Sequence, residues 1–313
     1  MENINNEHDV GYGFLLSTKQ VFLQLLESFV NKGWVDRIDA SELELVDKSL
    51  ISQEFEEKEA DLVYKVKIKD QEVIFYTLME LQSTVDYRMP YRLLIYMTEI
   101  WREIIKNYDK NVVTQKSFRL PVIVPIVLYN GKYNWNVPLN FKDMLNQAAM
   151  FEEQVLNFEY ILIDVKRYDQ EHLLQLSNLI STVFLLDQDA EDIGEFLERL
   201  NELIEVLKKL SPAEYSLFKI WFKKIIMNRF PKEHHREMEK LIDKTNVEQV
   251  GVMISGFEKN IIKVQEQGFE KGKKRNAVKI AKRMITKGVP LEEIADITEL
   301  SIDELKELAN KMD

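Results

Sequence analysis

Two short segments decide the fold of this chain: DLVYKVKI at residues 61–68 and VIFYTLME at residues 73–80. In the first, apolar and polar side chains alternate, which is the pattern of a half-buried strand. The second is rich in β-branched and aromatic side chains, which also favour a strand. Together they predict an antiparallel hairpin centred on Asp70 and Gln71. In that register residue 61 lies opposite 80, 63 opposite 78, and 65 opposite 76.

The predicted hairpin brings two carboxylates together. Asp61 and Glu80 become cross-strand partners with Cβ atoms about 4.5–5.5 Å apart, and Gln82 projects from the same face as Glu80. Two carboxylates this close repel each other unless a cation joins them, and Mg²⁺ is often bound by one or two carboxylates plus substrate phosphate. The alternative is that Asp61 ends a charged turn and Glu80 is a solvated strand end. A slip of one residue would place the two side chains on opposite faces.

Periodicity predicts the elements on either side of the hairpin. They are a helix over 14–31 that stops before Gly33, a weak strand over 43–51, a helix over 90–107, and strands over 121–129 and 158–165. Three consecutive strands indicate an antiparallel meander, and the helix over 90–107 then crosses over to a parallel strand. Asn130 and Gly131 follow the strand over 121–129 and form a type I′ turn signal.

The rest of the chain has a helical pattern. We expect helices over residues 171–186, 190–210, 213–229, 233–266, 276–287, 291–298 and 302–312. The chain therefore divides into an α/β region (1–170), a helical region (171–270) and a small helical module (271–313). Residues 288–301 resemble a helix-turn-helix, but the next helix begins with Ile302, Asp303 and Glu304. Its acidity favours a packing or homodimerisation module, with DNA contact as the alternative.

Composition excludes several classes of protein. The chain has 313 residues, 45% of them hydrophobic, and no cysteine, which excludes disulfides, thiolate catalysis and zinc–thiolate sites. Its N-terminus is polar and has no apolar core of a signal peptide. The longest apolar run, PVIVPIVLY at 121–129, is far shorter than the roughly 20 residues of a membrane span. We therefore expect a cytoplasmic protein without membrane contact.

The net charge of −11 hides a strong segregation of charge. Residues 271–287 contain eight basic and no acidic side chains, and Lys273, Lys274, Arg275 and Lys279 are the candidates for contact with DNA phosphates. The alternative is a solvated helix face that balances acidic neighbours.

Several motifs together resemble the recombination-promoting nuclease (Rpn) family, also called YhgA-like putative transposases. They are KEADLVY at 58–64, ELQS at 80–83, MPYR at 89–92 with Tyr96, and PVIVPIVLYNG at 121–131. The resemblance covers roughly residues 8–165, and GFEKG at 268–272 is similar to the C-terminal regions of such proteins. It implies a restriction-endonuclease-like α/β (α+β) core of the PD-(D/E)XK superfamily, with the order αβββαβ, followed by an all-α C-terminal region. It also implies Mg²⁺-dependent DNA cleavage linked to recombination or mobile elements.

The resemblance also assigns roles to residues. It implies that Asp61 is the metal-binding aspartate and Glu80 the second carboxylate, and it places Gln82 where most of the superfamily has lysine. A glutamine can orient a water or a phosphate but carries no charge. Arg92 and Tyr96 share one face of the following helix, where they could contact a DNA phosphate or make structural contacts instead.

The sequence is compatible with three functions. The first is a metal-dependent DNA endonuclease that uses Asp61, Glu80 and Gln82. The second is a DNA-binding recombination accessory protein with a weak or inactive site, which the glutamine at position 82 keeps in consideration. The third is a protein-interaction scaffold built on the acidic helical half.

Overall fold

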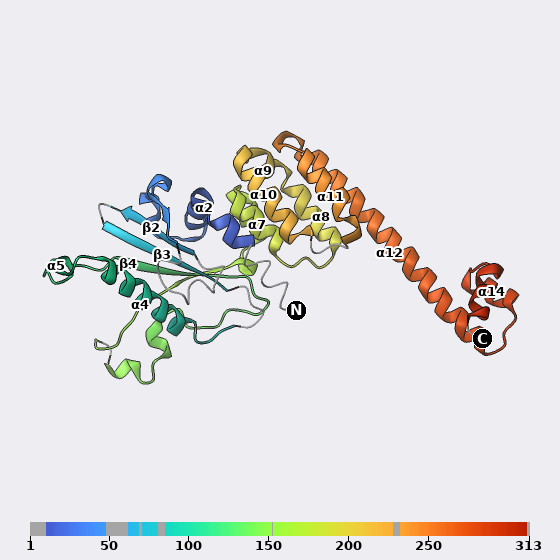
Figure 1. The fold of residues 1–313 in the computed structure, drawn as a ribbon, viewed down its shortest axis with the longest axis horizontal. Helices are drawn as coiled ribbons and strands as arrows, with labels where there is room; N and C mark the ends of the chain where they lie inside the picture. The colour runs from blue at the N-terminus through green and yellow to red at the C-terminus, as the bar shows by residue number, and fades with distance from the viewer. Residues whose placement is uncertain are drawn as a thin grey trace.

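The computed structural model describes residues 11–47, 62–68, 71–80, 85–151, 153–227 and 232–311. Within these ranges the protein has a sheet region, a bundle of helices beside it, and one long helix that leaves the bundle and carries a small module at its far end (Figure 1). The fold is therefore a mixed α/β fold with a helical C-terminal region, as the sequence predicts. No helix in the described part is both long and apolar enough to cross a membrane.

In the part of the chain that the structure describes, five strands form one mixed sheet in the order β1-β2-β3-β4-β5. Their bounds are β1 Glu44–Leu45, β2 Leu62–Ile68, β3 Gln71–Glu80, β4 Val122–Tyr129 and β5 Ile161–Asp164. The pairs β1–β2 and β2–β3 are antiparallel, whereas β3–β4 and β4–β5 are parallel. The chain passes from β3 to β4 through α4 (Met89–Asn107) and the short α5 (Lys110–Val113). The predicted meander and the crossover to a parallel strand are confirmed.

The predicted hairpin register is wrong by two residues. Val63 pairs with Tyr76 and Lys65 with Ile74, so residues 78 and 76 are not their partners. The reason is that Gln71 pairs with Ile68 as part of β3, which leaves two residues, 69 and 70, to connect the strands. A shift of two residues keeps every side chain on its original face, because the side-chain period of a strand is two.

The two faces of the sheet pack against different helices. On one face, β2 and β3 contribute Tyr64 and Phe75 to a core shared with α2 (Lys19–Phe29) and the helical bundle. Phe22 of α2 stacks on Tyr64 with ring centroids 4.2 Å apart. On the other face, α4 covers Ile74 and Tyr76. Because successive side chains of a strand point to opposite faces, each strand contributes side chains to the cores on both sides of the sheet.

Asn130 and Gly131 do not form the predicted hairpin turn, because β4 and β5 are parallel and a long connection separates them. The glycine has another role. A Cβ at Gly131 would lie 2.1 Å from the hydroxyl oxygen of Tyr129. Tyr129 is fully buried and donates a hydrogen bond to the Tyr133 carbonyl at 2.8 Å. Gly131 thus lets the backbone pass close over a buried tyrosine.

The helical region has more breaks than the sequence predicts. Its helices are α6 Gln170–Leu176, α7 Leu179–Asp187, α8 Ile193–Glu202, α9 Ile204–Lys209, α10 Pro212–Ile225 and α11 Lys232–Lys244. The helix expected over 171–186 is interrupted at Ser177, whose φ is 51°, and α7 restarts with a capping box at Asn178. The helix expected over 14–31 is likewise divided, into a helical segment at 11–16 and α2.

The C-terminal region contains a longer continuous helix than the sequence predicts. The helix expected over 233–266 ends at Lys244, and α12 then runs without a break over Val250–Thr286. The boundary placed between residues 270 and 271 falls inside α12. α13 (Leu291–Thr298) and α14 (Ile302–Asn310) fold back on its end around a small core of Ala281, Ile294, Leu300 and Leu305. Figure 1 shows this module well away from the rest of the molecule.

Candidate functional site

The carboxyl ends of the parallel strands form one edge of the sheet. Glu80, the last residue of β3, is in register with Tyr129 at the end of β4, and Tyr129 is in register with Asp164 at the end of β5. Asp61 and Gln82 lie outside the described residues, and Glu80 is described by its backbone alone. The shared metal site of Asp61 and Glu80 and the role of Gln82 therefore stay predictions. No cluster of three or more potential metal-ligating side chains occurs within the described ranges.

An ion-pair cluster lies at the start of α4. Arg92 approaches Asp86 with its Nη1 3.2 Å from Oδ2, and the Arg88 Nε lies 3.1 Å from Oδ1. Partial burial pushes the pKa of Asp86 upward. Hydrogen bonds from Arg88 and the charges of Arg92 and Arg88 outweigh that effect, so this pKa lies below its ordinary value. Arg92 thus makes an ion pair with Asp86 in this structure, and its contact with a DNA phosphate stays a prediction.

Tyr96, the other predicted phosphate contact on α4, belongs to the core. Only 7% of its surface is exposed, and its ring meets Tyr76 of β3 edge-on with centroids 5.5 Å apart. This contact holds α4 against the sheet. Arg92 and Tyr96 therefore have different surroundings, one in an ion pair and one in the α4 core.

Asp164 is a partly desolvated carboxylate at the same edge as Glu80. Burial raises the pKa of Asp164, and the charges of Arg167 and Lys166 offset this only in part. Its Oδ2 lies 3.7 Å from the Arg167 Nε, while its buried Oδ1 has no hydrogen-bond partner in the described structure. One strand, β4, separates Asp164 from Glu80 in the sheet, so two strand spacings of about 4.8 Å put their backbones roughly 10 Å apart.

A buried polar cluster joins the sheet to the helical bundle. Asp187, at the end of α7, is 2% exposed, and its Oδ2 accepts a hydrogen bond from the Tyr12 hydroxyl at 2.8 Å. The same oxygen accepts a second hydrogen bond from Asn130, directly after β4. Sequence reasoning missed this cluster, since its members are far apart in the chain and no local pattern links them.

The basic residues within 271–287, which we call the basic block, divide into two groups. The Lys273 Nζ lies 2.6 Å from a Glu299 carboxylate oxygen, and Lys274 pairs with Glu304 at the same distance. These hydrogen bonds raise the pKa values of both lysines, and the hydrogen bonds from Lys274 and Ser301 together lower the pKa of Glu304 to about 2. The two lysines therefore tie α12 to its terminal module. Arg275 and Lys279 are exposed to solvent.

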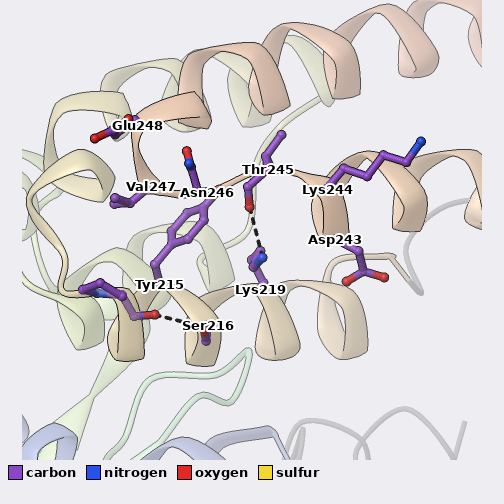
Figure 2. Close-up of a pocket in the computed structure, with 10 residues that line it drawn as sticks. Tyr215, Ser216, Lys219, Asp243, Lys244, Thr245, Asn246, Val247 and Glu248 are labelled. Atoms are coloured by element: carbon purple, nitrogen blue, oxygen red, sulfur yellow. Dashed lines mark hydrogen bonds between the residues drawn. The ribbon is translucent and has the colours of Figure 1, made fainter.

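The structure also has a polar cavity of about 510 Å³ between α10 and the junction of α11 with α12. Figure 2 shows Lys219 reaching across it toward Thr245, whose carbonyl accepts a hydrogen bond from the Lys219 Nζ at 3.1 Å. A lysine at the C-terminal end of a helix stabilises its unpaired carbonyls. Lys223 adds an ion pair with Asp243 at 2.6 Å. The polar side chains around the cavity thus make structural contacts between α10 and the α11–α12 junction.

Comparison with known proteins identifies the class to which the fold and motifs belong. The family described as "Putative transposase, YhgA-like" matches residues 6–216, which span the sheet region and the first helices of the bundle. The chain belongs to this family, and the resemblance to Rpn and YhgA-like proteins is confirmed.

Three curated relatives carry more specific names. The chain is 22% identical to the inactive recombination-promoting nuclease-like protein RpnE of Escherichia coli K12, over 95% of both chains. It is 23% identical to the recombination-promoting nuclease RpnD of E. coli O157:H7, over 54% of this chain and 62% of that protein. It is also 23% identical to the recombination-promoting nuclease RpnC of E. coli K12, over 63% of this chain and 64% of that protein. No solved structure matches the chain.

Proposed function

We propose that this protein is a metal-dependent DNA endonuclease that acts in recombination. The observation that carries the proposal is the family match over residues 6–216, together with relatives that are named recombination-promoting nucleases. The match includes the sheet edge at which Glu80 ends β3.

The proposed site lies at the carboxyl end of β3, where Glu80 is the last residue of the strand. In this proposal Asp61 and Glu80 share one divalent ion. The same edge has parallel neighbours, and open sheets bind ligands at the carboxyl ends of parallel strands.

Oxygen donors fit a hard divalent cation, so Asp61 and Glu80 would hold Mg²⁺. The ion would polarise the phosphate and lower the pKa of a bound water. In this proposal Gln82 orients the attacking water or a phosphate oxygen through its amide, without the positive charge that a lysine would supply.

A DNA-binding accessory protein with an inactive site is the second candidate. The relative that matches 95% of both chains is named an inactive nuclease-like protein, which supports this alternative. The two candidates differ in one measurable property, because only the endonuclease breaks phosphodiester bonds.

Nicking of supercoiled plasmid by the purified chain, with and without Mg²⁺, tests the proposal. We expect Mg²⁺-dependent nicking, and a loss of at least about 100-fold in Glu80→Gln and in Asp61→Asn, since even second-shell changes at metal sites cost 10- to 100-fold. Glu72→Gln is the matched control, because Glu72 lies on the same strand and pairs with Lys65 at 3.7 Å. Binding of DNA without nicking would establish the accessory protein instead. Equal nicking by all variants would exclude these carboxylates from catalysis.

A further inference from the structure

The exposed part of α12 has an unusual arrangement of charge. Between Ile261, which packs on the bundle, and Ala281, which packs on the terminal module, no described side chain of α12 is buried. Figure 1 shows this stretch as a single straight helix that projects from the bundle. Residues 271–287, which begin in this stretch and continue through the end of α12 to its C-cap, carry eight cations and no acid.

The structure separates these cations by their direction. Arg275, Lys279, Lys282 and Arg283 recur at three- and four-residue spacing, so they lie along one face of the helix, which we call the α12 stripe. Ala277, Ala281 and Met284 lie on the opposite face and pack against α13 and α14. Lys273 and Lys274 lie on the side of α12 that faces the module and form ion pairs with its acids.

No described side chain neutralises the α12 stripe. All four side chains are exposed, and no ion pair joins them to a carboxylate anywhere in the described structure. Like charges at this spacing repel one another on a helix. In contrast, the cations of α11 at positions 236, 240 and 244 alternate with Glu237, Glu239 and Asp243. A helix that concentrates unpaired cations on one face fits a polyanion.

We propose that the α12 stripe is a docking surface for the phosphate backbone of duplex DNA. The proposal rests on the proposed function, which makes DNA the polyanion that this protein meets. The stripe extends about 12 Å from Arg275 to Arg283 at 1.5 Å per residue. Its side chains are arginine and lysine, which contact phosphates through charge, so the surface positions the protein without reading sequence. Lys273 and Lys274, engaged with the module, are outside this surface.

The test is the salt dependence of DNA affinity, measured in EDTA by fluorescence anisotropy of a short labelled duplex. The stripe variant is Arg275→Gln/Lys279→Gln/Arg283→Gln. Three lost phosphate contacts lower the slope of log affinity against log salt by about 2 to 3, at roughly 0.9 per contact. Between about 50 and 200 mM salt, the affinity of the variant should therefore fall about 40-fold less than that of the wild type.

The matched control is Arg236→Gln/Lys240→Gln/Lys244→Gln, which removes three exposed cations at the same spacing from α11 and should leave the slope unchanged. Arg275→Lys/Arg283→Lys should also keep it, because phosphate neutralisation needs the charge and not the guanidinium. Circular dichroism checks that each variant is folded.

The remaining outcomes overturn the proposal in distinguishable ways. A wild-type slope in the stripe variant would show that DNA docks elsewhere, and Mg²⁺-dependent nicking would still support the endonuclease. A changed oligomeric state with unchanged DNA affinity would assign the α12 stripe to a second copy of the chain. A wild type that neither binds nor nicks DNA would refute both the stripe and the proposed function.

Discussion

Replacing Tyr12 by phenylalanine tests whether the buried cluster around Asp187 joins the two halves of the protein. The change removes one hydroxyl, which donates a 2.8 Å hydrogen bond to a carboxylate that is 2% exposed. A hydrogen bond to a charged group contributes about 1.5–3 kcal/mol, and the ring itself remains in place. We therefore expect Tyr12→Phe to lower the free energy of unfolding by about 1.5–3 kcal/mol.

Urea unfolding measures this loss. With a slope of about 3 kcal/mol per molar urea, the midpoint should fall by about 0.5–1 M. Tyr91→Phe is the control, since Tyr91 is 52% exposed and surface changes are usually within about 0.5 kcal/mol.

A double-mutant cycle isolates the contact between Tyr12 and Asp187. In an Asp187→Asn background the acceptor is neutral, so Tyr12→Phe should cost only about 0.5–1.5 kcal/mol. A Tyr12→Phe midpoint equal to that of Tyr91→Phe would refute the reasoning, because the carboxylate would then be fully stabilised by Asn130 and its other contacts.

Two further predictions concern the carboxyl edge of the sheet. Burial raises the folded-state pKa of Asp164 above its unfolded value of 3.8. The favourable contribution of Asp164 to the free energy of unfolding is therefore complete below pH 3.8, and it is lost as the pH rises through the folded-state pKa. Asp164→Asn should therefore raise the thermal midpoint at pH 7 and lose this advantage in acid; an equal or lower midpoint at pH 7 would contradict the assignment. Gly131→Ala should destabilise the protein by about 2–4 kcal/mol, from overpacking and the strained Tyr129 hydrogen bond, whereas Gly33→Ala, with nothing within 4 Å of its Cβ, should be nearly neutral. Equal urea midpoints for the two alanine variants would show that Tyr129 yields without cost.

The sheet could be predicted from the sequence because the pattern of apolar and polar residues along each strand reflects which side chains are buried. Val66 and Tyr64 alternate with lysines, and the structure buries the apolar pair on one face. The hairpin register could not be predicted, since the residues between the strands carry no strong turn signal and a shift of two residues leaves the alternation unchanged. Gly131 shows a related limit. Its sequence context indicates a turn, but contact with the ring of Tyr129 decides its role.

Long-range contacts account for most of what the sequence did not show. The cluster at Asp187 depends on how α7 packs beside the end of β4. The basic block could be recognised by composition, but its division into Lys273 and Lys274 on one hand and the α12 stripe on the other depends on where α13 and α14 fold back. The continuity of α12 was also missed, because Gly268 and Gly272 lower helix propensity by only about 1 kcal/mol each.

The length of α12 explains how a protein with a net charge of −11 can offer a site to a polyanion. From Ile261, the last residue of α12 buried against the bundle, to Arg275 the helix rises about 21 Å at 1.5 Å per residue. That distance exceeds the Debye length of about 8 Å at physiological ionic strength. The acidic bundle is therefore largely screened from the α12 stripe, and two acids of the terminal module, Glu299 and Glu304, are already paired with lysines. Local charge at the stripe, and not the total charge of the chain, then governs its attraction for phosphate.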